Sequence, residues 1–364
     1  MTSPTLGRSA LTAWAPSWDL IATRHLELRR RRGLLIVTAL LTAGVPVLIL
    51  GIRMLFHAFD PASYGPAGSP SLFQDLSNLI AQFGFLVAAA VGAAAGTSDL
   101  SEGVFRNLVI TGRSRLALYL ARIPAGLAIL LPIVALAFTI VCLVTSYAGV
   151  PDTASVSVGG VAIPLHLDQA GLRSWIQAHP HQAAIAFGSP TGPNGRPVPT
   201  TGQASHLTGT RLATFYSGYT SQEIAGANPA VNEMIKIGLW IELDIGIAFL
   251  AGLGLGSLTG QRTLSTIVLI ALQIIVTPLL ARVAIPYFLD GQRLVVGIAM
   301  DQLRPAGLAA GQGGGPGGPG GLLFGGHGAL GIPPMPTWAM ISVIAGWVVG
   351  WSAIGAGRMM TRDA

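Results

Sequence analysis

The stretch ARIPAGLAILLPIVALAFTIVCLVTSYAG, residues 121–149, decides the fold class. It carries one charged residue, Arg122, near its start. A helix needs about 20 apolar residues to cross the hydrocarbon core of a bilayer, which is about 30 Å thick. This run is longer than that, so it predicts a transmembrane helix.

Five further stretches of the same kind occur along the chain. The six predicted spans are 33–56, 77–97, 121–149, 235–258, 264–289 and 337–357. Of the 364 residues, 51% are hydrophobic and 10% are charged, and the mean hydropathy is +0.62. Because soluble domains carry about 25% charged residues, this composition lacks the polar surface of a soluble protein. It predicts an all-α, polytopic membrane protein with six transmembrane helices.

The distribution of basic residues predicts the orientation of these spans. On one side of the membrane 13 arginines lie in short connections and termini, whereas five are spread over the longer connections of the other side. The positive-inside rule places both termini in the cytoplasm, and we expect the chain to lie in the inner (plasma) membrane. The net charge of +6 is thereby explained by orientation in the lipid bilayer, and no nucleic-acid partner is expected.

The spans divide the chain into six parts. These are an N-terminal segment with an interfacial helix (1–32), three spans with a cytoplasmic connection at 98–120 (33–149), a long external loop or small external domain (150–234), two spans (235–289), a Gly/Pro-rich external loop (290–336), and the last span with the C-terminus (337–364). Within the first external part, 156–167 and 207–219 have enough apolar residues for short strands or helices.

Small residues recur at every fourth position of two spans. They are Gly84, Ala88, Gly92 and Gly96 in the second span, and Ala248, Gly252, Gly256 and Gly260 at the fourth. Small residues at this spacing allow helix backbones to approach closely in lipid. Packing within the chain is the favoured interpretation, and a seam between two copies is the alternative.

The connection between the second and third spans reads DLSEGVFRNLVITGRSRLALYLAR, residues 99–122. Asp99 and Glu102 favour a helix start, Gly112 favours a helix end, and Ser114 favours the start of the next helix. The pattern predicts a short helix on the membrane surface that is suited to docking on another protein. A loop that binds anionic lipid through its arginines is the alternative.

This connection resembles that of ABC-2 family permeases, the membrane subunits of ABC transporters. The resemblance rests on Glu102-Gly103, on the run from Phe105 to Leu108, on 112–115, and on Arg122 at the membrane entry. It also covers the layout of six spans with cytoplasmic termini, although the long loop 150–234 departs from many relatives. The resemblance implies a type V exporter-like architecture, a partner ATPase subunit, and a second permease copy as homodimer or a related permease. The residues it assigns to ATPase coupling are Glu102, Phe105, Arg106, Arg113 and Arg115.

The segment before the first span predicts an amphipathic helix. At 100° per residue one side carries the apolar residues Trp14, Trp18, Ile21 and Leu28. Arg29 to Arg32 follow where the chain enters the membrane. Such a helix lies in the membrane interface, and the resemblance implies that it is the connecting helix that contacts the ATPase. A general interfacial anchor is the alternative.

Sequence features argue against an enzymatic role for this chain. A P-loop needs Gly-Lys-Ser or Gly-Lys-Thr, and the single lysine, Lys236, follows Ile235. ATP and Mg²⁺ are therefore expected on the partner subunit, with no cofactor on this chain. We expect ATP-driven export of a drug, lipid, peptide or glycan. A secondary transporter and an intramembrane lipid-modifying enzyme are the alternatives.

Charged residues inside the spans are candidates for the transport pathway. They are Glu242 and Asp244 in the fourth span and Arg282 in the fifth. A bridge from one acid to Arg282 is the simplest expectation, and contact with substrate or a proton is the alternative. His166, His179, His181 and His206 all fall in 150–234. They lack the spacing of a metal site, and we interpret them as surface residues.

Overall fold

The computed structural model describes most of the predicted membrane region and parts of the external segments. The described residues are 16–60, 68, 70–101, 114–148, 155–158, 161–164, 167–187, 212–213, 216, 230–282, 288–305, 308 and 335–361. They divide into two units. The first comprises residues 1–50, 74–141 and 232–364, and the second comprises 51–73 and 142–231.

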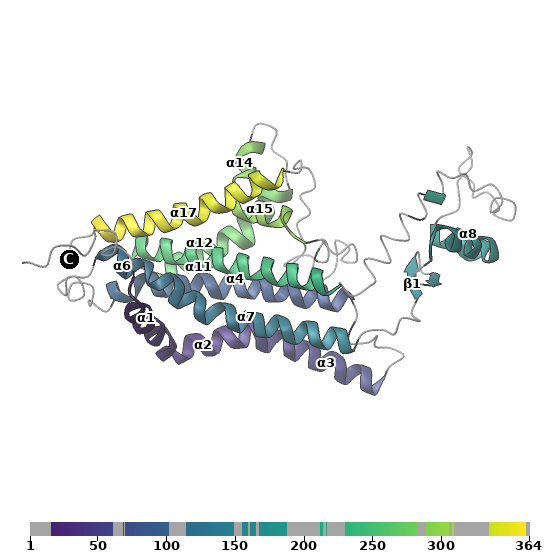
Figure 1. Cartoon of the computed structure of the whole chain (residues 1–364), viewed down its shortest axis with the longest axis horizontal. Coiled ribbons are helices and arrows are strands. Elements are labelled where there is room, and N and C mark those ends of the chain that lie inside the picture. Colours follow the sequence, from purple (N-terminus) through teal and green to yellow (C-terminus); the bar gives the residue numbers. More distant parts are fainter. Residues whose placement is uncertain are drawn as a thin grey trace, which may run out of the picture. The chain divides into compact units, whose positions relative to one another are not determined.

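Five helices are long and apolar enough to cross a membrane. They are Arg32–Phe59, which joins α2 (Arg32–Ala39), a π-helix η1 (Leu40–Gly44) and α3 (Val45–Phe59); α4 (Pro70–Ser101); Arg115–Tyr147, which joins α6 (Arg115–Leu120) and α7 (Arg122–Tyr147); α11 (Val231–Thr259); and α17 (Thr337–Thr361). Figure 1 shows the helices of the first unit running alongside one another. The predicted class, an all-α polytopic membrane protein, is confirmed.

The predicted fifth span, 264–289, begins as a helix in three consecutive parts. These are α12 (Arg262–Ala271), a π-helix η4 (Leu272–Val276) and α13 (Thr277–Arg282). Residues 283–287 lie outside the described residues. The continuous apolar helix in this region, Arg262–Val276, is shorter than the five helices that are long enough to cross a membrane.

Both π-helices directly precede a proline. The first, η1, ends two residues before Pro46, and η4 ends two residues before Pro278. Proline has no backbone N–H to donate to the carbonyl four residues earlier. A π turn is one way in which a helix accommodates that lost hydrogen bond. The two prolines therefore explain why these helices are not regular throughout.

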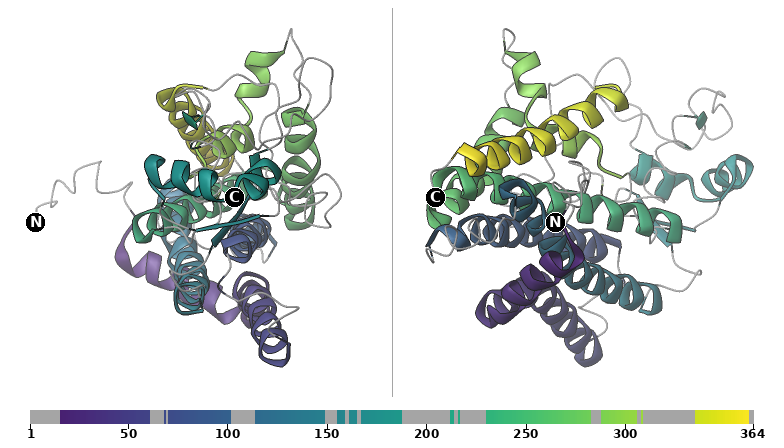
Figure 2. Two further views of the ribbon diagram at one scale, coloured as in Figure 1. Left: turned by 90° about the vertical axis from the view of Figure 1, so that its right-hand side faces the viewer. Right: turned by 60° about the vertical axis from the view of Figure 1, so that its left-hand side comes forward.

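Helices α4 and α11 form the centre of the first unit. In their apolar stretches 72% and 61% of the residues are buried, against 22% in Arg32–Phe59 and in α17. The peripheral helices expose large apolar side chains such as Ile36, Leu48 and Ile341. Figure 2 shows the same helices from two further directions. A buried centre with an apolar outer surface suits a bundle surrounded by lipid.

The predicted external loop 290–336 begins with ordered helices. Helix α14 (Leu289–Arg293) and helix α15 (Val296–Gln302) occupy its first part. Val296, Ala299 and Met300 of α15 are buried together with Ile344 of α17. The Gly/Pro-rich run 311–321 lies outside the described residues. This part of the loop therefore packs on the bundle through the apolar face of α15. This helix was not predicted from the sequence because Gly and Pro dominate the rest of the loop.

The second unit contains a hairpin and two short helices. Strands β1 (Ser155–Val158) and β2 (Val161–Pro164) pair antiparallel, with Val156 opposite Ile163. Helix α8 (Gln169–Ala178) starts at Asp168, whose carboxylate accepts a hydrogen bond from the Gly171 backbone N–H at 2.7 Å. Helix α9 (Pro180–Phe187) follows. The predicted regular structure at 156–167 is confirmed as a hairpin, whereas most of 207–219 lies outside the described residues.

Candidate functional site

The structure describes both ends of the predicted coupling connection 98–120. Residues 98–101 continue helix α4, so the helix start predicted at Asp99 is wrong, and residues 114–120 form the other end. Glu102, Phe105, Arg106 and Arg113 lie outside the described residues. Helix α6 begins immediately afterwards, and the Ser114 hydroxyl accepts a hydrogen bond from the Ala117 N–H at 3.2 Å. Ser114 therefore starts this helix, as its position after Gly112 predicts.

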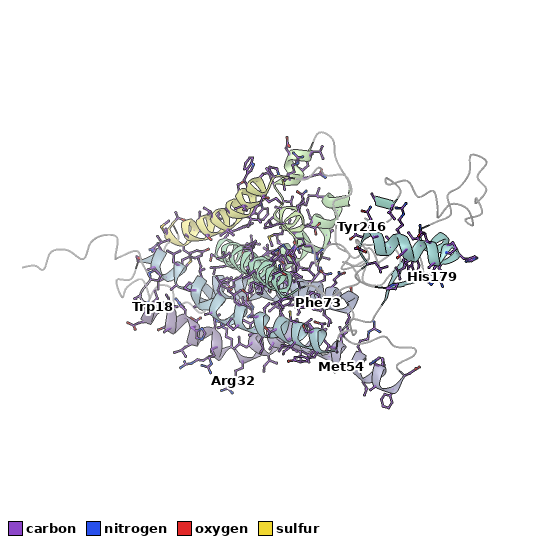
Figure 3. The ribbon with its side chains drawn as sticks, turned by 45° about the vertical axis from the view of Figure 1, so that its right-hand side comes forward. Trp18, Arg32, Met54, Phe73, His179 and Tyr216 are labelled. Atoms are coloured by element: carbon purple, nitrogen blue, oxygen red, sulfur yellow. The ribbon has the colours of Figure 1, made fainter. Side chains whose placement is uncertain are left out.

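Helix α6 packs against α1 (Trp18–Arg30), the helix that precedes the first span. Leu20 of α1 is buried with Ala117, Leu118 and Ala121. Trp18 is 84% exposed at the outer edge of the helices (Figure 3). The N-terminal helix thus contacts the element that directly follows the predicted coupling connection.

The buried side of α1 differs from the predicted one. It consists of Leu20, Arg24 and Leu28, with Ile21 partly buried. Of the residues predicted to share a side, Leu28 is buried whereas Trp18 is exposed, and Trp14 lies outside the described residues. The buried residues Leu20, Arg24 and Leu28 follow a four-residue spacing, and Arg24 forms an ion pair with Glu27 at 2.7 Å. Trp18 remains available to the membrane interface.

Arg115 connects α6 to the C-terminal helix. Its Nη1 donates a hydrogen bond to the Met360 carbonyl at 3.0 Å, in the last turn of α17. Carbonyl groups at a helix C-terminus carry partial negative charge and favour a cation. The fully buried Tyr119 lies against Gly355 of α17, where the absence of a side chain leaves room for its ring. Two contacts therefore join α6 to α17.

Arg122 connects the start of α7 to the two central helices. This side chain is buried, and its Nη1 donates a hydrogen bond to the Gly96 carbonyl of α4 at 3.2 Å. The Ser257 hydroxyl of α11 lies 3.5 Å from the same carbonyl. The α6–α7 junction thus contacts α1 through Leu20, α17 through Arg115, and α4 and α11 near Arg122. We call this the basic end of the bundle.

The two small-residue ladders face each other within the chain. A side chain at Gly96 would place its Cβ 2.6 Å from the Leu253 carbonyl oxygen, and one at Gly256 would lie 2.7 Å from the Ala93 oxygen. Gly92 and Gly252 make equally close approaches to the opposite backbone. Intrachain packing, the favoured interpretation of the ladders, is confirmed for α4 and α11.

A cluster of charged side chains lies toward the other end of the bundle. Asp244 of α11 is buried, and it interacts electrostatically with Arg304, which follows α15. Arg304 also forms an ion pair with Asp301 of α15, with Nη1 3.5 Å from Oδ1. The guanidinium is therefore paired with Asp301 and lies within electrostatic range of Asp244. We call Asp244, Asp301 and Arg304 the charge cluster.

Polar groups of two helices hold Arg304 in place. Its Nη2 donates a hydrogen bond to the Asn78 side chain of α4, and its guanidinium lies over the Trp240 ring of α11, 5.4 Å from the centroid. The Trp240 Nε1 donates to the Met300 carbonyl at 3.0 Å. The Arg304 Nε is buried and has no hydrogen-bond partner among the described residues. The cluster therefore ties α15 to both central helices.

Side-chain hydrogen bonds also attach α14 and α15 to their other neighbours. The Gln292 amide donates to the Leu280 carbonyl of α13 at 2.9 Å, and the Trp347 Nε1 of α17 donates to the Leu294 carbonyl at 2.7 Å. Each bond satisfies a backbone carbonyl near a helix end, where helical partners are lacking. The α14–α15 element is therefore fixed to the bundle on several sides.

The intramembrane acids lie near a cation that the sequence expectation did not include. A bridge from Glu242 or Asp244 to Arg282 was expected, and in the described part of the chain Asp244 lies within electrostatic range of Arg304. The Arg282 side chain lies outside the described residues, and Glu242 is half-buried on α11. Sequence reasoning missed Asp301 and Arg304 because it treated 290–336 as loop, and it also missed Asn78 in the second predicted span. The apolar run 294–300 next to Asp301 and Arg304 was the available signal.

Two of the four histidines in the predicted external part, His179 and His181, lie in the described part of the chain. His179 stacks on Trp175 with 5.1 Å between ring centroids, and its Nδ1 lies 3.1 Å from the Trp175 carbonyl oxygen. His166 and His206 lie outside the described residues. Among the residues that were described, no three His, Cys, Asp or Glu side chains are grouped for a metal ion. His179 therefore has a local packing partner.

Comparison with known proteins identifies no relative. No protein-family model, no curated protein and no solved structure matches this chain. Functional inference consequently rests on the residues and contacts described above.

Proposed function

We propose that this chain is the transmembrane permease subunit of an ATP-driven ABC exporter, with ATP hydrolysis on a separate subunit. The substrate class is a drug, lipid, peptide or glycan. The proposed assembly contains a second permease copy. Six spans would form half of the translocation pathway, and the second copy would supply the other half. The motif at 102–115 and its resemblance to ABC-2 permeases are the starting point of the proposal.

The observation that carries the proposal is the set of contacts at the basic end. A partner bound to residues 102–113 would act directly on α6, since α6 starts at Arg115. From α6 a displacement would reach α1 through Leu20, α17 through Arg115, and α4 and α11 through Arg122. The Leu20 and Arg122 contacts are buried, and buried contacts transmit strain because packed interiors yield little. This arrangement suits a subunit that converts movement of a partner into movement of its spans.

The experiment is affinity purification of the tagged full chain from its own cells. We expect a P-loop ATPase to co-purify and the purified complex to hydrolyse ATP. Arg106→Glu should reduce the amount of ATPase recovered while membrane insertion stays intact. Arg173→Glu, in the predicted external part, is the matched control and should leave recovery unchanged. Recovery of the chain without any P-loop protein, or equal recovery with both variants, would contradict the proposal.

A further inference from the structure

The charge cluster contains an excess of one negative charge when both acids are ionised. Asp244 lies on α11 and Asp301 on α15, and the guanidinium of Arg304 is paired with Asp301 and lies within electrostatic range of Asp244. Asp244 is buried, and the Asp301 and Arg304 side chains are only 22% and 13% exposed. Asn78 and Trp240 supply no compensating charge. A net charge in such surroundings is costly, and a proton on one carboxylate removes it.

We propose that Asp244, Asp301 and Arg304 form a proton-binding latch that holds α15 against α4 and α11. One carboxylate takes up a proton from solvent, and the net charge of the cluster changes from −1 to zero. The neutral cluster keeps Arg304 on Asn78 and Trp240. Loss of the proton restores the excess charge, draws water toward the cluster and loosens α15. This device is independent of the proposed transport function.

The direction of the pH effect follows from Asp301. Burial raises the pKa of Asp301 from 3.8 to about 6, and Arg304 offsets part of this rise. Asp301 therefore keeps its proton in the folded chain at pH values where the unfolded chain has lost it. The folded state is stabilised by this group at low pH, and that stabilisation declines as the pH rises from 3.8 to about 6.

The chain supplies a matched control pair. Asp290 and Arg293 in α14 have the same i, i+3 spacing, with 3.3 Å between Nη1 and Oδ1. The Asp290 side chain is 98% exposed, against 22% for Asp301. Solvent screens an exposed pair, and its contribution to stability is small. Asp290→Asn therefore removes the carboxylate of a similar Asp–Arg pair, but this carboxylate is exposed.

The test measures the melting temperature of the full chain in detergent from pH 4.5 to 7.5. The wild type should lose stability as the pH rises. Asp301→Asn and Asp244→Asn each leave one acid for one guanidinium, so both should flatten this profile and melt higher than the wild type at pH 7.5. Asp290→Asn should follow the wild type. Equal profiles for all four chains, or a flat wild-type profile, would overturn the proposal.

A second measurement reports on the attachment of α15. Hydrogen exchange of residues 296–302, corrected for the intrinsic pH dependence of exchange, should be slower at pH 5 than at pH 7.5 in the wild type. In Asp301→Asn it should be slow at both pH values. Arg304→Gln leaves two uncompensated acids, so exchange should be fast at pH 7.5 and partly slowed at pH 5. If α15 exchanges at the same corrected rate in every chain, the cluster does not act as a latch.

Discussion

Substitutions at two glycines of helix α11 test whether α4 and α11 must pack as closely as they do. A Cβ at Gly256 would lie 2.7 Å from the Ala93 oxygen, whereas nothing lies within 4 Å of one at Gly246. We expect Gly256→Ala to cost about 1–3 kcal/mol by overpacking. Gly246→Ala, the control, should be neutral or gain about 0.5–1 kcal/mol from helix propensity. Unfolding of the purified chain measures both, and equal stability would show that the α4–α11 contact tolerates extra volume.

At this residue scale the ladder prediction is confirmed, whereas the predicted bridge to Arg282 involves a side chain outside the described residues. Gly and Ala at every fourth position give a helix one flat side, against which another helix can pack closely. For α4 and α11, each such side packs against the other within the same chain. Asp244 is different, since a buried acid needs a cation from any direction. Arg304, which lies within electrostatic range of Asp244, is 60 residues away in a region dominated by Gly and Pro, and helix geometry alone could not identify it.

The contact between α1 and α6 can be tested with two leucines of one helix. Leu20 is 8% exposed and packs on α6, whereas Leu26 is 52% exposed. Leu20→Ala should destabilise the attachment of α1 by about 2–5 kcal/mol because it leaves a cavity. Leu26→Ala should have little effect. Faster hydrogen exchange of residues 18–30 in the first variant alone is the expected result, and equal exchange in both would place α1 outside the packed bundle.

At the element scale the apolar runs predicted the long helices and their approximate bounds. Their irregularities follow from Pro46 and Pro278, which the sequence also marks, although a π turn is only one of several ways to accommodate a proline. Helices α14 and α15 were not predicted. Each is shorter than two turns, and short helices obtain their stability from contacts such as Trp240 to Met300 and Trp347 to Leu294. Those contacts come from distant parts of the chain.

At the scale of the molecule, the contacts at the basic end constrain whether the chain crosses the membrane an even or an odd number of times. Helix α1 and the last turn of α17 both contact α6, so the chain enters and leaves at the same end. An even number of crossings is required between them. Five long helices alone give an odd number. We assign the remaining crossing, as a prediction, to α12, η4 and α13, whose combined length of roughly 30 Å matches the hydrocarbon core.

We therefore predict six crossings, with α12 to α13 as the fifth. Single cysteines are introduced into a Cys142→Ser chain at the exposed positions Asp19, Gln169, Asp290 and Thr361. Intact cells are then treated with a membrane-impermeant maleimide. Cysteines at Gln169 and Asp290 should be labelled, while those at Asp19 and Thr361 should react only after the membrane is opened. If α12 to α13 fails to cross, the cysteine at Asp290 stays protected in intact cells, and the even number of crossings implied by the contacts of α6 is lost.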